Sequence, residues 1–219
     1  MAELSLEGAL TPEQRQAWAG LDSPAAIQSF LDHVPYSPEN ANRCPRRVML
    51  DRQAHCLDGG LFAAAALRRL GDPPLIVDLL PEPVIDEDHV IAVFRRDGLY
   101  GAIAKSNFVG LRYREPVYRT LRELVMSYFE WFFNVDGIKT LRAYTRPVDL
   151  SRFDHLHWET QDAGADALEQ HLKHLHGMRV VSSQAAGRLL PVDRLSYQAG
   201  LLAANMDGLY RPQEHPAAD

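Results

Sequence analysis

One of the two cysteines in this sequence, Cys56, directly precedes an apolar, alanine-rich segment, in the stretch RQAHCLDGGLFAAAALRRLG (residues 52–71). Gly71 and the two prolines that follow are typical of a helix end, so we expect a helix that begins near Cys56. A thiol at a helix N-terminus lies close to unpaired backbone N–H groups, which lower its pKa and favour the reactive thiolate. The position therefore predicts a nucleophile. The alternative is a small thiol buried between the helix and a sheet.

A nucleophilic cysteine needs a base, and His89 is the strongest candidate among the nine histidines. It opens the apolar run HVIAVF, so one helix and one strand separate it from Cys56. That layout brings the start of the helix and the start of the strand together. A third polar group should orient the imidazole from the neighbouring strand.

The hairpin signal RRDGLY identifies two candidates for the orienting group. A two-residue Asp97-Gly98 turn pairs Arg96 with Leu99 and, extended to the strand start, His89 with Ser106. A bulge would place Asn107 on that face instead. Asn107 is preferred because an amide oxygen accepts well from an imidazole N–H, and Ser106 remains the alternative.

The elements expected around these residues make an α+β protein. Two short helices open the chain, a Pro- and Asn-rich connection follows, and three strands come after the central helix. A long helix is expected over TLRELVMSYFEWFF, and the glycines Gly59 and Gly60 indicate close packing against the central helix. We expect a core over residues 1–150 and a mostly helical C-terminal extension over 151–219, packed on the core, with a last helix in LSYQAGLLAANMDGLY and a frayed tail RPQEHPAAD.

The segments IQSFLDHVPY, PRRVMLDRQAHCLDGGLFAAAALRRLGDPPLIVDLL and DEDHVIAVFRRDGLYGAIAKSN together resemble the transglutaminase-like superfamily of papain-type folds, over about residues 25 to 110. The resemblance implies a central helix packed on a small antiparallel sheet. It also implies thiol attack on an amide or thioester carbonyl, with Cys56 as nucleophile, His89 as base and then acid, and Asn107 as orienter. Where the family usually has aspartate, this chain has KSN. The Cys56 backbone N–H and the Gln53 side chain are the expected oxyanion donors.

Other charged and aromatic clusters bear on substrate and metal binding. Arg112 and Tyr113 follow the third strand and are candidates for binding a substrate carboxylate or phosphate, although a solvated face with ion pairs is the favoured interpretation. Five of the six histidines in the C-terminal region lie between residues 155 and 176, and no ligand set accompanies them, so we expect no metal, no calcium loop and no cofactor. They are His155, His157, His171, His174 and His176.

Composition limits the functional classes. The net charge of −6 argues against nucleic acid as the main partner. Two cysteines make no disulfide framework, no apolar run is long enough for a membrane span, and no secretion signal is evident. We therefore expect a soluble, cytoplasmic enzyme acting on a peptide, a protein or a small amide, by hydrolysis or acyl transfer. A non-catalytic interaction module is the alternative, and a regulatory protein that binds a partner through its His-rich region is a third; the sequence leaves the oligomeric state open.

Overall fold

Seven strands form one antiparallel sheet in the computed structural model, which describes residues 5–211. The strand order is β4-β3-β2-β1-β5-β7, and the short β6 also pairs with β1. The strands are β1 (Leu75–Pro81), β2 (His89–Arg96), β3 (Leu99–Ile103), β4 (Arg114–Tyr118), β5 (Leu141–Tyr144), β6 (Val148–Asp149) and β7 (Met178–Arg179). The α+β class expected from the sequence is confirmed.

The helices precede, follow and interrupt this sheet in the chain. The α-helices are α1 (Pro12–Ala19), α2 (Pro24–Asp32), α3 (Pro45–Asp51), α4 (Cys56–Arg69), α5 (Leu121–Met126), α6 (Asp162–Lys173), α7 (Ser183–Ala186) and α8 (Arg194–Gly200). Short 3-10 helices are η1 (Glu7–Ala9), η2 (Val109–Leu111), η3 (Phe129–Trp131), η4 (Leu150–Leu156) and η5 (Met206–Gly208). Helix α3 lies within the connection expected to be mostly loop. Proline at its first position, which suits a helix start, is the signal for it.

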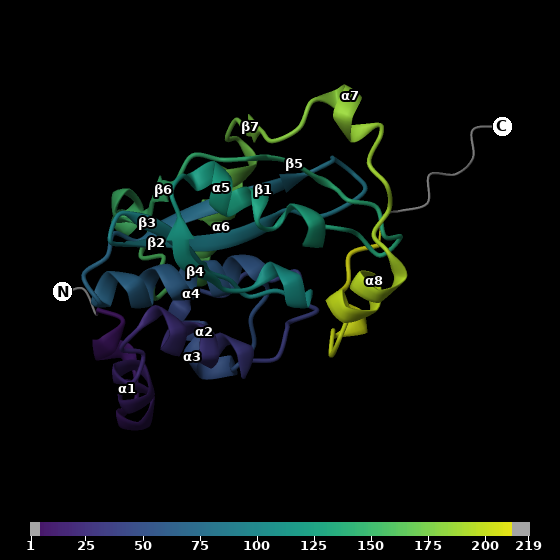
Figure 1. Ribbon diagram of the computed structural model, residues 1–219. Coiled ribbons are helices and arrows are strands. Elements are labelled where there is room, and N and C mark those ends of the chain that lie inside the picture. The colour runs from purple at the N-terminus through teal and green to yellow at the C-terminus, as the bar shows by residue number, and fades with distance from the viewer. Residues whose placement is uncertain (1–4, 212–219) are drawn as a thin grey trace.

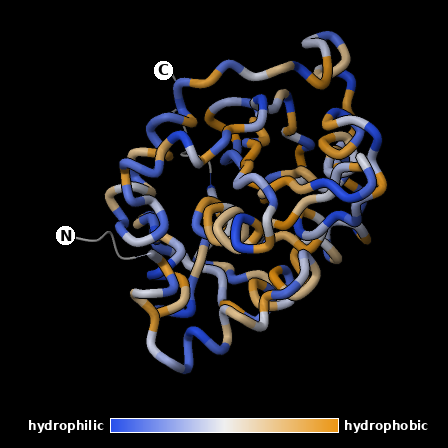
Figure 2. The backbone as a smooth tube through the Cα atoms, turned by 90° about the vertical axis from the view of Figure 1, so that its left-hand side faces the viewer, coloured by the Kyte–Doolittle hydropathy of each residue, from blue (hydrophilic) through white to orange (hydrophobic). Residues whose placement is uncertain are grey.

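Helix α4 is the buried centre of the molecule. Figure 1 shows it between the sheet and the N-terminal helices α1–α3. One apolar cluster joins α4, α6, the N-terminal helices and one face of the sheet, and a second cluster lies on the opposite face with α5. Figure 2 shows apolar stretches running through the middle of the molecule and polar stretches along much of its periphery. Among residues 5–211, no helix has the length and apolar character to cross a bilayer.

Close packing of α4 on the sheet explains its two glycines. A Cβ on Gly59 would lie 2.2 Å from the Cβ of Lys105, and a Cβ on Gly60 would lie 2.7 Å from Val90 Cγ1. The two glycines are therefore needed because β2 and the segment just after β3 lie close to the helix. Lys105 is held there because its ammonium donates to the carbonyls of Leu31 and Val34 at the end of α2.

The β2–β3 hairpin has the expected register. Asp97 and Gly98 both have positive φ, at 52° and 82°, as a type I′ turn requires. Arg96 pairs with Leu99, and the ladder runs to Ala92 opposite Ile103. The ladder ends there, so Ser106 and Asn107 lie beyond the strand and no pairing places either opposite His89.

The prediction of one long helix over residues 120–133 is wrong, because α5 ends at Met126 and the 3-10 helix η3 follows. Ser127 lies at the break, where Arg114 donates to its hydroxyl and its carbonyl. The expected apolar positions are nevertheless buried against the sheet, including Leu124, Val125 and Phe132. Tertiary hydrogen bonds thus replace the continuation of the helix.

The region after residue 150 joins the core. Strand β7 extends the sheet beside β5, and Leu168 and Leu172 of α6 are buried in the cluster around α4. The last helix, α8, covers a shorter stretch than expected. The expected frayed tail, apart from Arg211, lies outside the described residues.

Candidate active site

Cys56 is the first residue of α4, as the sequence predicts. Its side chain is half-buried, and its Sγ lies 3.8 Å from the carbonyl oxygen of Asp88, to which the thiol donates. The residue lines two adjoining cavities, an open cleft of about 510 Å³ and an inner cavity of about 50 Å³. A cleft therefore leads to the sulfur.

His89 is the first residue of β2, and its side chain lines the same inner cavity as Cys56. The imidazole is buried, and its Nε2 lies 2.8 Å from the carbonyl oxygen of Leu111. A carbonyl can only accept a hydrogen bond, so in this ring orientation Nε2 carries the proton. Nδ1 is then unprotonated and has the lone pair of a base.

The pKa values of both groups are shifted toward their neutral forms. Burial raises the pKa of the Cys56 thiol, and the negative charges of Asp88 and Glu87 raise it further. Burial lowers the pKa of His89 to about 4, although the hydrogen bond to Leu111 raises this pKa. Burial and nearby carboxylates thus oppose the thiolate that the helix start was expected to favour.

Asn107 and Ser106 line the inner cavity, but the hydrogen bond of the His89 ring goes to Leu111 and not to either of them. The Asn107 amide donates to the Asn205 carbonyl at 2.8 Å and accepts from the Asn205 N–H at 2.7 Å. The Ser106 hydroxyl accepts from the Phe108 N–H. The predicted orienter roles of both residues are therefore not seen here, because β3 ends at Ile103 and the following loop turns Asn107 toward the C-terminal segment.

Residues 205–211, called here the C-terminal strap, form one wall of both cavities through Gly208 and Tyr210. Besides the two bonds to Asn107, the Asn205 side chain donates to the Tyr36 carbonyl at 3.0 Å. The Tyr210 hydroxyl donates to the Val84 carbonyl at 2.9 Å. Nothing in the local sequence of the strap indicates this contact across the chain.

Tyr36 is a site residue that the sequence reading missed. It lines both cavities, and the backbone N–H of Cys56 lies close enough to hydrogen-bond its hydroxyl. Burial raises the pKa of Tyr36 well above its ordinary value, and a charge on Cys56 or Glu87 acts in the same direction. The phenol therefore stays protonated and remains a hydrogen-bond donor beside the sulfur.

Three predicted residues lie apart from Cys56, and none of them lines either of its cavities. The Gln53 side-chain oxygen accepts from Arg43 at 3.4 Å. Arg112 pairs with Asp32 of α2 at 3.6 Å, and Tyr113 stacks on Phe94. The loop after β3 directs Arg112 and Tyr113 to the α2 edge of the molecule, so the predicted oxyanion and substrate roles are not supported.

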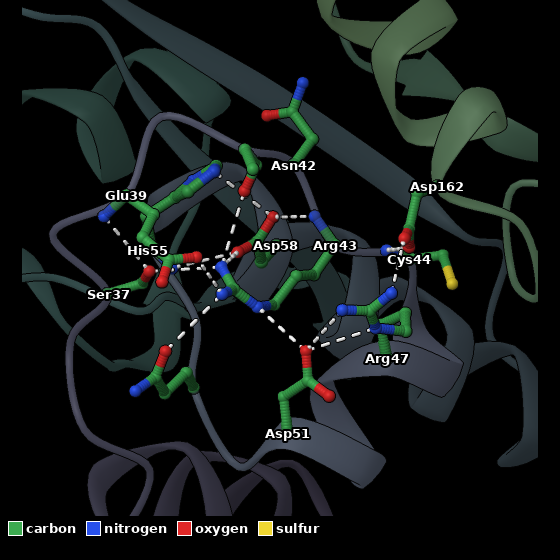
Figure 3. Close-up of polar contacts among 12 residues, drawn as sticks. Ser37, Glu39, Asn42, Arg43, Cys44, Arg47, Asp51, His55, Asp58 and Asp162 are labelled. Carbon is green, nitrogen blue, oxygen red and sulfur yellow. Dashed lines mark hydrogen bonds and ion pairs between the residues drawn. The ribbon is translucent and has the colours of Figure 1, made fainter.

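A buried ionic cluster holds the start of α4, as Figure 3 shows. Asp58 is fully buried and accepts from the backbone N–H groups of Arg43 at 2.7 Å and of His55 at 3.1 Å. The Arg43 guanidinium lies 3.9 Å from the same carboxylate. Burial raises the pKa of Asp58 to about 7. These contacts tie the loop before Cys56 to the first turn of α4, and so position the thiol.

The other cysteine, Cys44, is buried in the protein interior. Cys44 is fully buried at the start of α3, and burial raises its pKa to about 12. Among the histidines of the C-terminal region, the His171 ring packs against Phe153. Over residues 5–211 no three His, Cys, Asp or Glu side chains converge as a metal-ion site.

No protein-family model matches this chain, and no curated protein matches it significantly. A thiol and an unprotonated imidazole nitrogen share one small cavity at the end of an open cleft, beside two hydrogen-bond donors. Such a set can perform nucleophilic attack on a carbonyl carbon.

Proposed function

We propose that this protein catalyses thiol-dependent acyl transfer or hydrolysis at an amide-type bond, through Cys56 and His89. The observation that carries the proposal is that the first residue of α4 and the first residue of β2 line one inner cavity, which adjoins the cleft. The helix packed on an antiparallel sheet, with Cys56 at its start, also supports the resemblance to a transglutaminase-like core.

The reaction begins from the neutral pair. The Cys56 thiol passes its proton to Nδ1 of His89 while the sulfur forms a bond to the substrate carbonyl carbon. The imidazolium then gives that proton to the leaving amine, the carbon–nitrogen bond breaks, and a thioester remains on Cys56. Water or a second amine attacks the thioester, loses its proton to His89, and the thiol is restored as the acyl group leaves.

The oxyanion of the tetrahedral intermediate is stabilised by the donors beside the sulfur. As the first residue of α4, Cys56 has no acceptor for its N–H within the helix. The Tyr36 hydroxyl accepts from this N–H and keeps its own proton, so a substrate oxygen that replaced the hydroxyl as acceptor could receive a hydrogen bond from each group. Tyr36 thus takes the role that the sequence reading gave to Gln53.

The walls of the cleft favour a substrate with neutral or cationic groups. Acidic side chains outnumber basic ones there, and an anionic substrate would be repelled. The acidic residues in the wall are Glu39, Glu87, Asp88, Glu169 and Asp207, and Arg211 is the basic one. A peptide, a protein segment or a small amide of this kind is the proposed substrate.

A second candidate function is that of a non-catalytic interaction module. Two observations favour it. The Asn107 amide is bonded to the strap rather than to His89, and the thiol is held in its neutral form. In this function the cleft would bind a peptide without cleaving or transferring it.

A single-turnover experiment separates the two functions. The full chain is mixed with p-nitrophenyl acetate at pH 7.5, and p-nitrophenolate release and intact mass are followed. Catalysis predicts a burst of about one equivalent and a single acetyl group on Cys56. Cys56→Ser should abolish the burst, and His89→Gln should slow acylation about 10²- to 10⁴-fold, since general-base catalysis contributes about that much.

Cys44→Ser is the matched control, because Cys44 is the other thiol and is buried away from the cleft. This variant should keep the full burst. Acylation that proceeds equally fast in His89→Gln, or that labels Cys44, would contradict the proposed enzyme and favour the interaction module.

A further inference from the structure

Asp78 is a buried carboxyl without a hydrogen-bond donor. It lies in the middle of β1, and only 1 % of its surface is exposed. Neither of its oxygens accepts a hydrogen bond from any described residue. Leaving a buried acceptor unsatisfied destabilises the fold, and more so for a charged group. The fold keeps this carboxyl despite the cost, so a function for it is expected. The proposed thiol chemistry gives Asp78 no role.

The side chain of Asp78 lines a cavity of about 770 Å³, formed by β1, β5, α6 and the segment around β7. A second carboxyl, that of Asp88, lies close enough for its negative charge to raise the pKa of Asp78. Asp88 is exposed, lines this cavity and lines both cavities of Cys56. The carboxyl pair therefore reaches from the interior of the sheet to solvent.

The basic side chains in the cavity wall already have acceptors. Arg142 pairs with Glu82 at 2.7 Å, and Lys173 pairs with Glu169 at 2.7 Å. Arg179 donates to the Ser183 hydroxyl at 3.0 Å. The remaining acid of the wall, Asp86, is bonded to the Thr140 hydroxyl and the Glu87 N–H. Asp78 and Asp88 are thus left without a direct cationic partner.

We propose that this cavity binds a small organic cation, an alkylammonium, whose N–H donors are held by Asp78 and Asp88. The rest of the wall suits the alkyl body, because Leu80, Leu172 and Leu175 line it. Of the four carboxyls in this wall, Glu82 and Asp86 already have partners, and no three metal-ligating side chains of the described residues converge, so an N–H donor fits the site better than a metal ion. The proposal does not depend on the thiol chemistry, because Cys56 does not line this cavity.

Binding should release a proton. Burial and the negative charge of Asp88 raise the pKa of Asp78 well above its ordinary value, so the empty site holds a proton that an ammonium would displace. Binding should therefore tighten as the pH rises. The groups that face the pair are Cys56 from α4, Glu169 and Lys173 from α6, Arg142 from β5, Arg179 from β7, and Glu82 and Asp86 from the loop after β1.

Isothermal titration calorimetry of the full chain with n-butylammonium tests the site. We expect saturable binding at pH 8, of about millimolar affinity for so small a ligand, with proton release revealed by buffers of different ionisation enthalpy. The n-butyltrimethylammonium ion keeps the charge but lacks N–H donors, and n-butanol lacks the charge. Both should bind at least about 10-fold more weakly.

Asp78→Asn should weaken n-butylammonium binding about 10- to 100-fold and remove the proton release. Asp86→Asn is the matched control, because Asp86 lines the same cavity but its carboxyl already has donors. This variant should bind as the wild type does. If Asp78→Asn fails to fold, the wild-type titration at pH 5 and pH 8 decides the matter.

Equal affinity in Asp78→Asn, equal affinity at the two pH values, or no saturable binding by the wild type would overturn the proposal. Each of these results is a binding result. It therefore leaves the acylation experiment on Cys56 unaffected, and the two proposals can fail separately.

Discussion

The imidazole of His89 is oriented by a backbone carbonyl, that of Leu111, at 2.8 Å. The carbonyl determines the tautomer as a carboxylate or an amide oxygen would, because all three only accept from the ring N–H. Unlike a carboxylate, it adds no full negative charge to stabilise an imidazolium. The consequence is a histidine whose pKa, lowered to about 4 by burial, keeps the ring neutral at pH 7.

The two candidate oxyanion donors can be separated by substitution. Tyr36→Phe removes one hydroxyl beside the Cys56 N–H and should lower the acylation rate about 10²-fold, which is typical for the loss of one oxyanion donor. Gln53→Ala should leave the rate nearly unchanged, because Gln53 lines neither cavity of Cys56. Stopped-flow release of p-nitrophenolate measures both. A larger loss in Gln53→Ala than in Tyr36→Phe would restore the assignment made from the sequence.

Helix α4 depends on what surrounds its first two turns. The Asp58 carboxylate holds the backbone of Arg43 and His55 on one side, and the glycines allow the sheet to approach on the other. The thiol at the helix start is thereby placed against the loop that leads into β2, where it meets Asp88. Packing of this helix, rather than its macrodipole, determines the environment of the sulfur.

Gly59→Ala tests this packing. The added methyl would lie 2.2 Å from the Lys105 Cβ, and the Lys105 side chain is anchored at the end of α2. We expect a loss of about 1–3 kcal/mol in the free energy of unfolding, measured by urea denaturation, as is typical of overpacking. Gly187→Ala is the control, since its nearest neighbour would be 3.7 Å away, and it should be neutral. An unchanged Gly59→Ala would show that the helix and sheet are not packed so closely.

The site as a whole is assembled from segments that are far apart in the chain. Tyr36, Cys56, His89 and Asn107 come from four different elements or loops, and the C-terminal strap lies beside them. The strap is bonded to Asn107 across 98 residues of sequence. Access to the thiol therefore depends on the C-terminal region as well as on the core.

Asn107→Ala should loosen the strap. Two hydrogen bonds of about 1 kcal/mol each are lost, so we expect iodoacetamide to alkylate Cys56 about 10-fold faster or more. Intact-mass spectrometry over time measures the rate. Ser106→Ala, at a neighbouring position in the inner cavity, keeps the bonds between Asn107 and the strap and should react as the wild type does. Slower alkylation of Asn107→Ala would instead indicate the orienter role expected from the sequence.

The local signals in the sequence were sufficient for most of the elements and for two residues of the site. Glycine and proline at the helix ends, the Asp-Gly turn and the apolar runs predicted α4, β1, β2 and β3, because these features act within a few residues. The positions of Cys56 and His89 at the starts of their elements followed from the same signals. The long helix was mispredicted because Arg114, which contacts Ser127, reaches it from another strand.

The tertiary structure alone decided what surrounds the thiol. Leu111 contacts His89 through its backbone carbonyl, and Asp88 contacts the thiol in the same way. Tyr36 lies beside Cys56, and Asn205 bonds to Asn107. The spacing of residue types in the sequence indicates none of these contacts. The pKa of Cys56 is raised for the same reason: burial and neighbouring charges are properties of the packed molecule. A sequence determines which residues begin an element, whereas the environment of their side chains exists only once distant segments have packed together.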